Sequence, residues 1–258
     1  MMTPIMFIGH GNPMNAIEDN EYTSGWESIA ESIPLPTAIL VISAHWSTKG
    51  TKVSVVEQPR TIHDFYGFPQ ELHEVNYPAD GSPFFAKRTI ELLGDEADSD
   101  DTWGLDHGTW SVLKKMYPKA DVPVYQMSID MYASPEELFS IGERLKPLRE
   151  EGVMILGSGN VVHNLGYMNF AARDGFDWAR EFDDYMETNI KMRDFQSLFD
   201  YKYLYEISSL AVPTTEHLYP LFCILGCTDE DDQVTVYNKL YDSGSLSMTS
   251  YVFEHIKE

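Results

Sequence analysis

Three histidines follow short apolar segments of the chain, each after a few small residues. His10 follows residues 5–8, His45 follows residues 38–42, and His163 follows residues 153–156. Continuous apolar runs of this length, closed by glycine or serine, predict strands buried on both faces of an α/β sheet. Ligands and catalytic groups collect at the carboxyl ends of such strands. Because imidazole is a good ligand for iron and zinc, the pattern predicts a site for a first-row metal.

A fourth histidine, His217, closes the sequence Pro213-Thr214-Thr215-Glu216-His217. We expect residues 207–212 before it to be extended and a helix to begin near Glu216. Taken alone, His10 between two glycines fits either of two roles. It could be a metal ligand, since glycines let the backbone and a metal come close, or it could be a histidine in a turn. A buried His45 needs either a hydrogen-bond partner or a metal, because an unpaired buried imidazole is costly.

Two further histidines lie in segments suited to substrate contact. His107 follows Asp106 in a segment that has two readings. In the first, the histidine is an acid, a base or a hydrogen-bond donor; in the second, the segment is only a loop that caps the next helix. His63 opens an aromatic stretch that includes Tyr66, and Trp46 adjoins His45. Flat aromatic side chains suit the wall of a pocket for a planar ligand, although each ring alone also fits ordinary packing. We therefore expect His63, Trp46 and Tyr66 to bind substrate.

Composition and charge exclude several classes of partner. The chain has 258 residues, of which 43% are apolar, so it can bury a full core. Its formal charge of −23 would repel nucleic acid and anionic membranes, which leaves a small molecule as the expected partner. The glycine-rich residues 157–160 lack the spacing of a dinucleotide loop and the lysine of a phosphate-binding loop.

Targeting and redox signals are absent from the sequence. The first apolar run has four residues, too few for the core of a signal peptide, and no stretch approaches the length of a membrane span. We expect a cytoplasmic protein. Cys223 and Cys227 are spaced four residues apart in an apolar segment and are expected to be packing groups rather than a redox or metal pair.

Strand and helix signals alternate along the whole chain. This order predicts a single α/β domain over residues 1–258, with a largely parallel mixed sheet covered by helices on both faces. The expected strands are residues 5–8, 37–42, 52–56, 122–127, 153–156, 233–237 and 246–253. The expected helices are residues 18–33, 82–93, 110–117, 134–150, 177–200 and 216–226.

The histidine-bearing segments, taken together and in order, resemble the type III extradiol ring-cleaving dioxygenases, in the branch that includes the DOPA 4,5-dioxygenases. The resemblance extends from residue 5 to about residue 225. It is carried by six motifs: Gly9-His10-Gly11-Asn12-Pro13, Ser43-Ala44-His45-Trp46, residues 63–69, residues 105–110, residues 157–165 and residues 213–217.

The resemblance implies a mononuclear metal, with ferrous iron in the active form and zinc possible in the isolated protein. It implies that His10, His45 and His217 hold the metal. His163 would be the base or a further ligand, and His107 would steady bound substrate or oxygen. Protocatechuate-cleaving relatives supply a glutamate as third ligand, but Glu216 and His217 are neighbours and point in different directions on a helix, so we favour His217. The implied reaction opens a catechol ring with dioxygen to give a semialdehyde.

Two alternatives remain at the level of the sequence. A zinc-dependent hydrolase of a small amide or ester would use the same histidines to activate water. A metal-binding protein of the same fold without catalysis would need only the three ligands. The presence of His163 and His107 beyond those three favours an enzyme.

Overall fold

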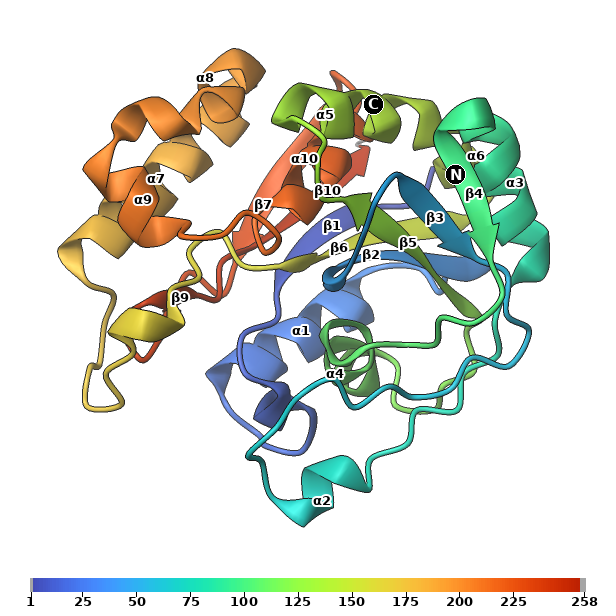
Figure 1. Ribbon diagram of the computed structural model, residues 1–258, viewed down its shortest axis with the longest axis horizontal. Helices are drawn as coiled ribbons and strands as arrows, with labels where there is room; N and C mark the ends of the chain where they lie inside the picture. The colour runs from blue at the N-terminus through green and yellow to red at the C-terminus, as the bar shows by residue number, and fades with distance from the viewer. Residues whose placement is uncertain (1, 256–258) are drawn as a thin grey trace.

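An eight-stranded mixed sheet forms the centre of the molecule, and the computed structural model describes residues 2–255 (Figure 1). The strand order is β4-β3-β5-β2-β6-β1-β10-β7. The strands of the sheet are β1 (Ile5–Gly9), β2 (Ala38–Thr48), β3 (Thr51–Ser54), β4 (Ala97–Asp100), β5 (Val124–Asp130), β6 (Val153–Gly159), β7 (Asp232–Tyr237) and β10 (Ser250–His255). A separate short pair is formed by β8 (Tyr241–Asp242) and β9 (Leu246–Ser247).

Parallel pairing dominates the middle of the sheet. Strands β5, β2, β6 and β1 are parallel neighbours, whereas β10 and β7 add an antiparallel edge beyond β1. Strand β3 pairs antiparallel with β5 and parallel with β4 at the other edge. The predicted fold class, a largely parallel mixed α/β sheet, is therefore confirmed.

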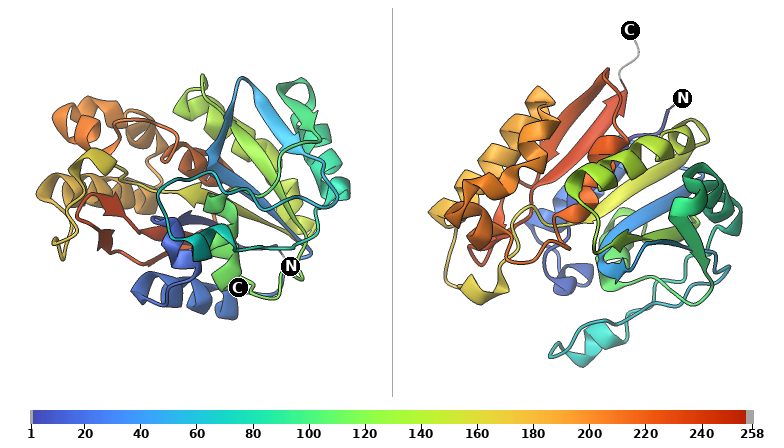
Figure 2. Two further views of the ribbon diagram at one scale, coloured as in Figure 1. Left: turned by 60° about the horizontal axis from the view of Figure 1, so that its bottom comes forward. Right: turned by 45° about the horizontal axis from the view of Figure 1, so that its top comes forward.

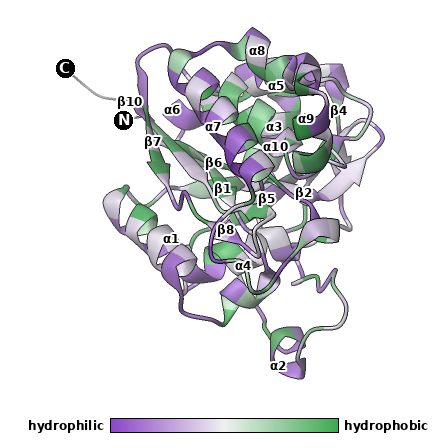
Figure 3. Cartoon of the chain, turned by 90° about the vertical axis from the view of Figure 1, so that its left-hand side faces the viewer, coloured by the Kyte–Doolittle hydropathy of each residue, from purple (hydrophilic) through white to green (hydrophobic). Residues whose placement is uncertain are grey.

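Helices cover both faces of the sheet, as the views in Figures 1 and 2 show. Successive strand residues face opposite sides, so Phe7 and Leu40 join one hydrophobic core while Met6 and Val41 join the other. Helices α3 (Pro83–Leu93), α5 (Pro135–Leu145), α7 (Asp177–Met192) and α10 (Tyr219–Gly226) contribute to the first core. Helices α1 (Glu21–Ser32) and α4 (His107–Met116) contribute to the second. Figure 3 shows the hydrophobic residues concentrated in the central strands, with hydrophilic residues along the outer helices.

The helices follow the signals that the sequence carries. Helix α1 begins after Asn20 and α5 begins after Ser134, and each of these residues closes a capping box. The α-helices are α1 (Glu21–Ser32), α2 (Gln70–His73), α3 (Pro83–Leu93), α4 (His107–Met116), α5 (Pro135–Leu145), α6 (Pro147–Glu150), α7 (Asp177–Met192), α8 (Phe195–Phe199), α9 (Glu206–Ala211) and α10 (Tyr219–Gly226). Four short 3-10 turns are η1 (Pro13–Ala16), η2 (Gly94–Glu96), η3 (Leu165–Tyr167) and η4 (Tyr201–Leu204).

Several predicted elements differ from the structure. The prediction that residues 207–212 are extended is wrong, because Glu206–Ala211 forms helix α9, in which the hydroxyls of Ser208 and Ser209 donate to the carbonyl of Tyr205. Pro147 divides the helix predicted over residues 134–150 into α5 and α6, since a proline lacks the amide that would continue the hydrogen-bond ladder. The strand predicted over residues 246–253 forms two separate strands, β9 and β10.

The two cysteines are free and buried, as predicted for packing groups. Burial raises the pKa of the Cys227 thiol to about 12, which keeps it protonated and unreactive. Within residues 2–255, no helix has both the length and the apolar character that crossing a bilayer requires.

Candidate metal centre

The carboxyl ends of three central strands meet at one edge of the sheet and carry histidines. His10 follows β1 directly, and His163 lies four residues beyond the end of β6. Strand β2 continues past the predicted end, so His45 lies within it. The register between β2 and β5 shifts between Ile42 and Ser47, and such an irregularity redirects the side chains inside it. The sheet therefore brings His10 and His45 to the same place.

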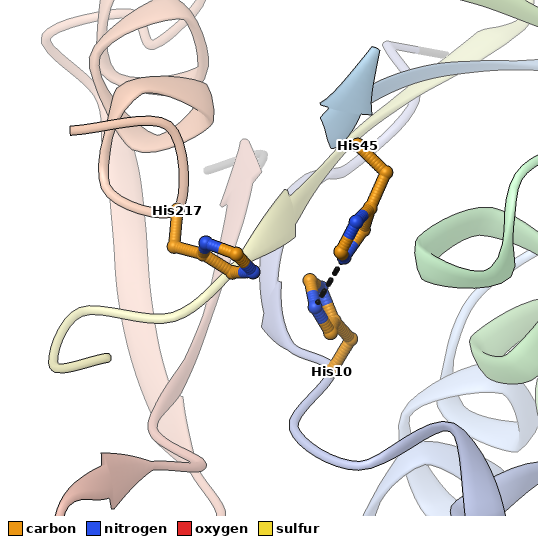
Figure 4. A group of neighbouring side chains, drawn as sticks. All are labelled: His10, His45 and His217. Atoms are coloured by element: carbon orange, nitrogen blue, oxygen red, sulfur yellow. Dashed lines mark hydrogen bonds between the residues drawn. The ribbon is translucent and has the colours of Figure 1, made fainter. Parts of the chain in front are cut away.

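The ring nitrogens of His10, His45 and His217 converge on one point. One nitrogen of each ring lies within 4.8 Å of the corresponding nitrogen of the other two. The Nε2 atoms of His10 and His45 are 3.1 Å apart, and Figure 4 shows a nitrogen of His217 pointing toward this pair. Two nitrogens that bind one ion at about 2.0–2.1 Å are separated by roughly 3 Å, so the spacing suits shared coordination.

Hydrogen bonds to the other ring nitrogens fix the tautomers. The Ser158 hydroxyl donates to the Gly108 carbonyl at 2.6 Å, so it accepts from Nδ1 of His10 at 2.9 Å. The Glu216 carboxylate accepts from Nδ1 of His217 at 3.1 Å. With Nδ1 protonated in both rings, each Nε2 carries a lone pair.

The third ring also has a carboxylate behind it, because Oδ2 of Asp64 lies 3.5 Å from Nδ1 of His45. Three lone pairs that face one another repel unless a cation lies between them. Metal-bound histidines are characteristically oriented in this way by carboxylates or other acceptors behind the ring. The donor set therefore fits a metal ion.

Burial keeps these histidines neutral, which is the state that binds metal. Burial, together with the neighbouring histidines, lowers the pKa of His10 and of His217 well below the ordinary value. Burial and His107 lower the pKa of His45 to about 3, against the opposing effect of Asp64. At neutral pH no proton competes with a metal for the three Nε2 atoms.

His107 is held by the same carboxylate that lies behind His45. The backbone amide of His107 donates to Oδ1 of Asp64 at 2.9 Å, and Nδ1 of His107 is 3.0 Å from Oδ2. His107 is the first residue of α4, with Asp106 as the N-cap, so the helix begins three residues before its predicted start at residue 110. The capping bond from the Thr109 amide to Asp106 draws His107 into the helix.

We predict that Asp64→Asn weakens metal binding by roughly 10–100-fold, the usual effect of removing a group that orients a ligand. An amide keeps the size of the side chain but removes the negative charge that lies beside Nδ1 of both His45 and His107. Competition of the protein with a chelator for zinc would measure the change. Asp98→Asn, at an exposed carboxylate on β4, is the matched control, and unchanged affinity in Asp64→Asn would contradict the orienting role.

The convergent histidines form the floor of a cavity of about 520 Å³. His163 lies in this cavity with its ring stacked on that of His217, at 3.4 Å between centroids and 5° between planes. Burial lowers the pKa of His163 to about 4. The lining residues are His10, Gly11, Asn12, Pro13, His45, Phe65, Phe68, His107, His163, Leu165, Met168, Phe170, His217 and Leu246.

The structure does not bring the three predicted substrate-binding residues into this cavity. Trp46 faces away from its neighbour His45, as alternate strand residues do, and stacks on Trp103 at 5.1 Å. Tyr66 is 95% exposed, and His63 donates to the carbonyl of Val75 at 2.9 Å. Of the aromatic stretch around Tyr66, only Phe65 and Phe68 line the cavity.

Glycines near the centre serve close backbone packing. A Cβ on Gly159 would lie 2.1 Å from the His217 carbonyl oxygen, and the Asn160 amide donates to that oxygen at 2.9 Å. A Cβ on Gly9 would lie 2.6 Å from the backbone of Met248. Gly9 and Gly159 therefore admit neighbouring chain segments, whereas Gly11, on the other side of His10, lines the cavity.

Sequence reasoning missed the groups behind the ligands and the far wall of the cavity. Ser158 and Asp64 orient His10 and His45, and Glu216, which was considered only as a ligand, orients His217. Leu165 and Phe170 line the cavity from the segment after His163. A polar residue one position before a strand end, such as Ser158, gives no local signal of this role.

Nearly the whole chain is similar to known proteins of one family. Residues 3–254 match the family model described as the catalytic LigB subunit of aromatic ring-opening dioxygenase. The 4,5-DOPA dioxygenase extradiol of Escherichia coli K12 is 44% identical, over 96% of this chain and 93% of that protein. The protein of the same name from Beta vulgaris is 38% identical, over 96% of this chain and 95% of that protein.

A solved structure supports the relationship. The crystal structure of an uncharacterized protein from Escherichia coli K12 superposes with a TM-score of 0.85 at 39% identity, covering 98% of this chain and 100% of the other. Sequence similarity and structural similarity thus extend over nearly the whole chain. The chain belongs to the LigB family of aromatic ring-opening dioxygenases.

Proposed function

We propose that His10, His45 and His217 hold one ferrous ion, and that a catechol-type substrate binds to it in the cavity above through both ring oxygens. As a member of this family the chain is a metal-dependent extradiol dioxygenase, which opens an aromatic ring beside its two hydroxyls with dioxygen. The observation that carries the assignment is the convergence of three lone-pair nitrogens on the floor of a largely apolar cavity. We further propose that residues 1–258 act as one catalytic domain.

Iron is the proposed metal because ring opening needs electrons to pass between the ring and dioxygen. Ferrous iron with three imidazole ligands keeps positions for both substrates and supplies that redox chemistry. Zinc fits the same nitrogens but has no redox chemistry, so we expect the zinc form to be inactive.

His163 is proposed to accept a proton from a catechol hydroxyl. Its ring is neutral at pH 7, because burial lowers its pKa, and it lies in the cavity beside a proposed ligand. His107 is proposed to steady bound substrate or oxygen by a hydrogen bond. Its position is fixed through Asp64, and its ring centroid lies 3.8 Å from that of His45.

The alternatives considered from the sequence are not supported. A zinc hydrolase needs a general base beside the metal-bound water, and no carboxylate is among the described residues that line the cavity. Asp64 and Glu216 instead lie behind ligand rings. The match to ring-opening dioxygenases favours an enzyme over a non-catalytic metal-binding protein of the same fold. The cytoplasmic location stays a prediction.

We predict that turnover requires vicinal hydroxyls. Protein loaded anaerobically with ferrous iron should consume oxygen with catechol and give a yellow semialdehyde, whereas phenol should support no uptake. A phenol forms one metal bond in place of two and leaves a coordination position to water. An oxygen electrode and product absorbance measure both. Equal binding of phenol and catechol, or ester hydrolysis without oxygen uptake, would overturn the assignment.

A further inference from the structure

Asp106 is a fully buried carboxylate that has no lysine or arginine partner among the described residues. Its Oδ1 atom accepts from the Ser43 hydroxyl at 2.7 Å and from the Thr109 amide at 3.1 Å. Its Oδ2 atom accepts from Nε2 of Gln126 at 2.7 Å. Burying a charge that has no ionic partner is costly, and a helix N-cap does not require one, because serine or asparagine caps as well. The carboxylate therefore indicates a role beyond capping α4.

Two hydrogen bonds join Asp106 to Gln126. The side-chain amide of Gln126 donates to the Asp106 carboxylate, and the backbone amide of Asp106 donates to Oε1 of Gln126 at 3.0 Å. Gln126 lies on β5, where it pairs with Val41 of β2, so these bonds anchor the start of α4 to the centre of the sheet. A carboxylate suits the position because both of its oxygens only accept.

The Ser43 hydroxyl connects Asp106 to the backbone of the proposed ligand His45. It donates to the carboxylate and accepts from the His45 amide at 3.2 Å. The paired residues of β2 with β5 and of β2 with β6 do not include His45. The contact from Asp106 through Ser43 therefore holds the part of the backbone from which His45 reaches the metal site.

The first turn of α4 also reaches a second proposed ligand. The Gly108 carbonyl accepts from the Ser158 hydroxyl at 2.6 Å, and that hydroxyl accepts from Nδ1 of His10 at 2.9 Å. A Cβ on Gly108 would lie 2.7 Å from Oγ of Ser43 and 2.9 Å from Cδ2 of His45, so the turn packs directly against the segment that carries His45. Two of the three proposed ligands are thus oriented by contacts with this turn.

We propose that Asp106 is a positioning residue for the metal centre, which holds the first turn of α4 against β2 and β5 so that His10 and His45 keep the spacing that one ion requires. Asp106 is not among the residues that line the cavity, so it acts through these neighbours and not by contact with substrate. The inference rests on the proposed function and extends the centre to a group outside the cavity.

Asp106→Asn tests this role without removing the helix cap. The amide keeps an oxygen for the Thr109 amide, but its NH₂ group faces the NH₂ group of Gln126, so a hydrogen bond between the two side chains is lost. We expect the zinc affinity, measured by competition with a chelator, to fall by about 10–100-fold. The visible absorption spectrum of cobalt-loaded protein reports the coordination geometry and should change as well.

A second substitution should restore the contact. In the double variant Asp106→Asn/Gln126→Glu, the carboxylate on β5 accepts from the amide at position 106 and from the backbone, so both hydrogen bonds return. We expect this variant to recover most of the zinc affinity and the cobalt spectrum. Asp194→Asn makes the same substitution at the N-cap of α8, outside the cavity, and should leave both unchanged.

Unchanged zinc affinity and cobalt spectrum in Asp106→Asn overturn the inference, as does a double variant that regains thermal stability without zinc affinity. If Asp106→Asn does not fold, Ser43→Ala supplies the test, because it removes only the hydroxyl between Asp106 and the His45 amide. Lower zinc affinity in Ser43→Ala supports the inference, and equal affinity overturns it. Absence of oxygen uptake with catechol in the unaltered chain contradicts the proposed function instead, so the two failures are distinguishable.

Discussion

His45→Ala is expected to lose bound metal and ring-opening activity together. His45 supplies one of three convergent nitrogens, and its Nε2 atom lies 3.1 Å from that of His10. Loss of an orienting group alone lowers metal affinity by about 10–100-fold, so loss of a ligand should exceed the upper end of that range. Metal content of the purified variant after iron loading, together with oxygen uptake with catechol, measures both effects.

His255→Ala is the control for His45→Ala, because His255 is exposed at the end of β10 and is not part of the cavity. It should bind one metal per chain and keep full activity. The folded state of each variant is compared by circular dichroism and thermal unfolding. A His45→Ala protein that binds one metal with the affinity of the unaltered chain would exclude His45 from the ligand set.

The positions of His10 and His45 could be predicted because local sequence determines them. Residues 5–8 and 38–42 are continuous apolar runs, which are stable only as strands buried on both faces. Parallel strands end at a common edge, so polar residues after them come together whatever the connections are. Strands β1 and β2 each pair in parallel with β6, so the residues that follow their carboxyl ends, His10 among them, lie at the same edge of the sheet.

The approach of His217 depends on contacts that are distant in sequence. Its carbonyl accepts from the Asn160 amide, and it packs against Gly159 at the end of β6. The segment before it was predicted as extended, yet residues 206–211 form α9. The prediction from residues 213–217 was nevertheless useful, because it rested on a family motif rather than on the preceding secondary structure.

The aromatic residues show why proximity in sequence is a weak guide to a pocket. Trp46 adjoins His45 and Tyr66 adjoins Phe65, but neighbours in extended chain face opposite sides. Applying that alternation to residues 65–68 would have favoured Phe65 over Tyr66. The shared contact of Asp64 with His45 and His107 had no comparable signal, since the three residues belong to three separate segments.

His163→Phe is expected to keep the metal and lose turnover by about 10²–10⁴-fold, the usual contribution of general-base assistance. His163 belongs to a set with Glu216 and His217, and it shares no such set with His10 and His45 among the described residues. Its ring is parallel to that of His217 at 3.4 Å, so truncation to alanine would also leave the ligand unsupported. Phenylalanine keeps this stacking but cannot accept a proton.

Metal content and single-turnover rates of His163→Phe and His163→Ala, beside His45→Ala, separate the possible roles of His163. Full metal with slow turnover in His163→Phe is expected for a base, whereas His163→Ala can also lose metal because it removes the ring stacked on His217. If both are as empty of metal as His45→Ala, His163 is a fourth ligand. If His163→Phe turns over at the normal rate with full metal, proton transfer belongs to another group. His107 is then the next residue to replace, because it is the remaining histidine of the cavity outside the proposed ligand set.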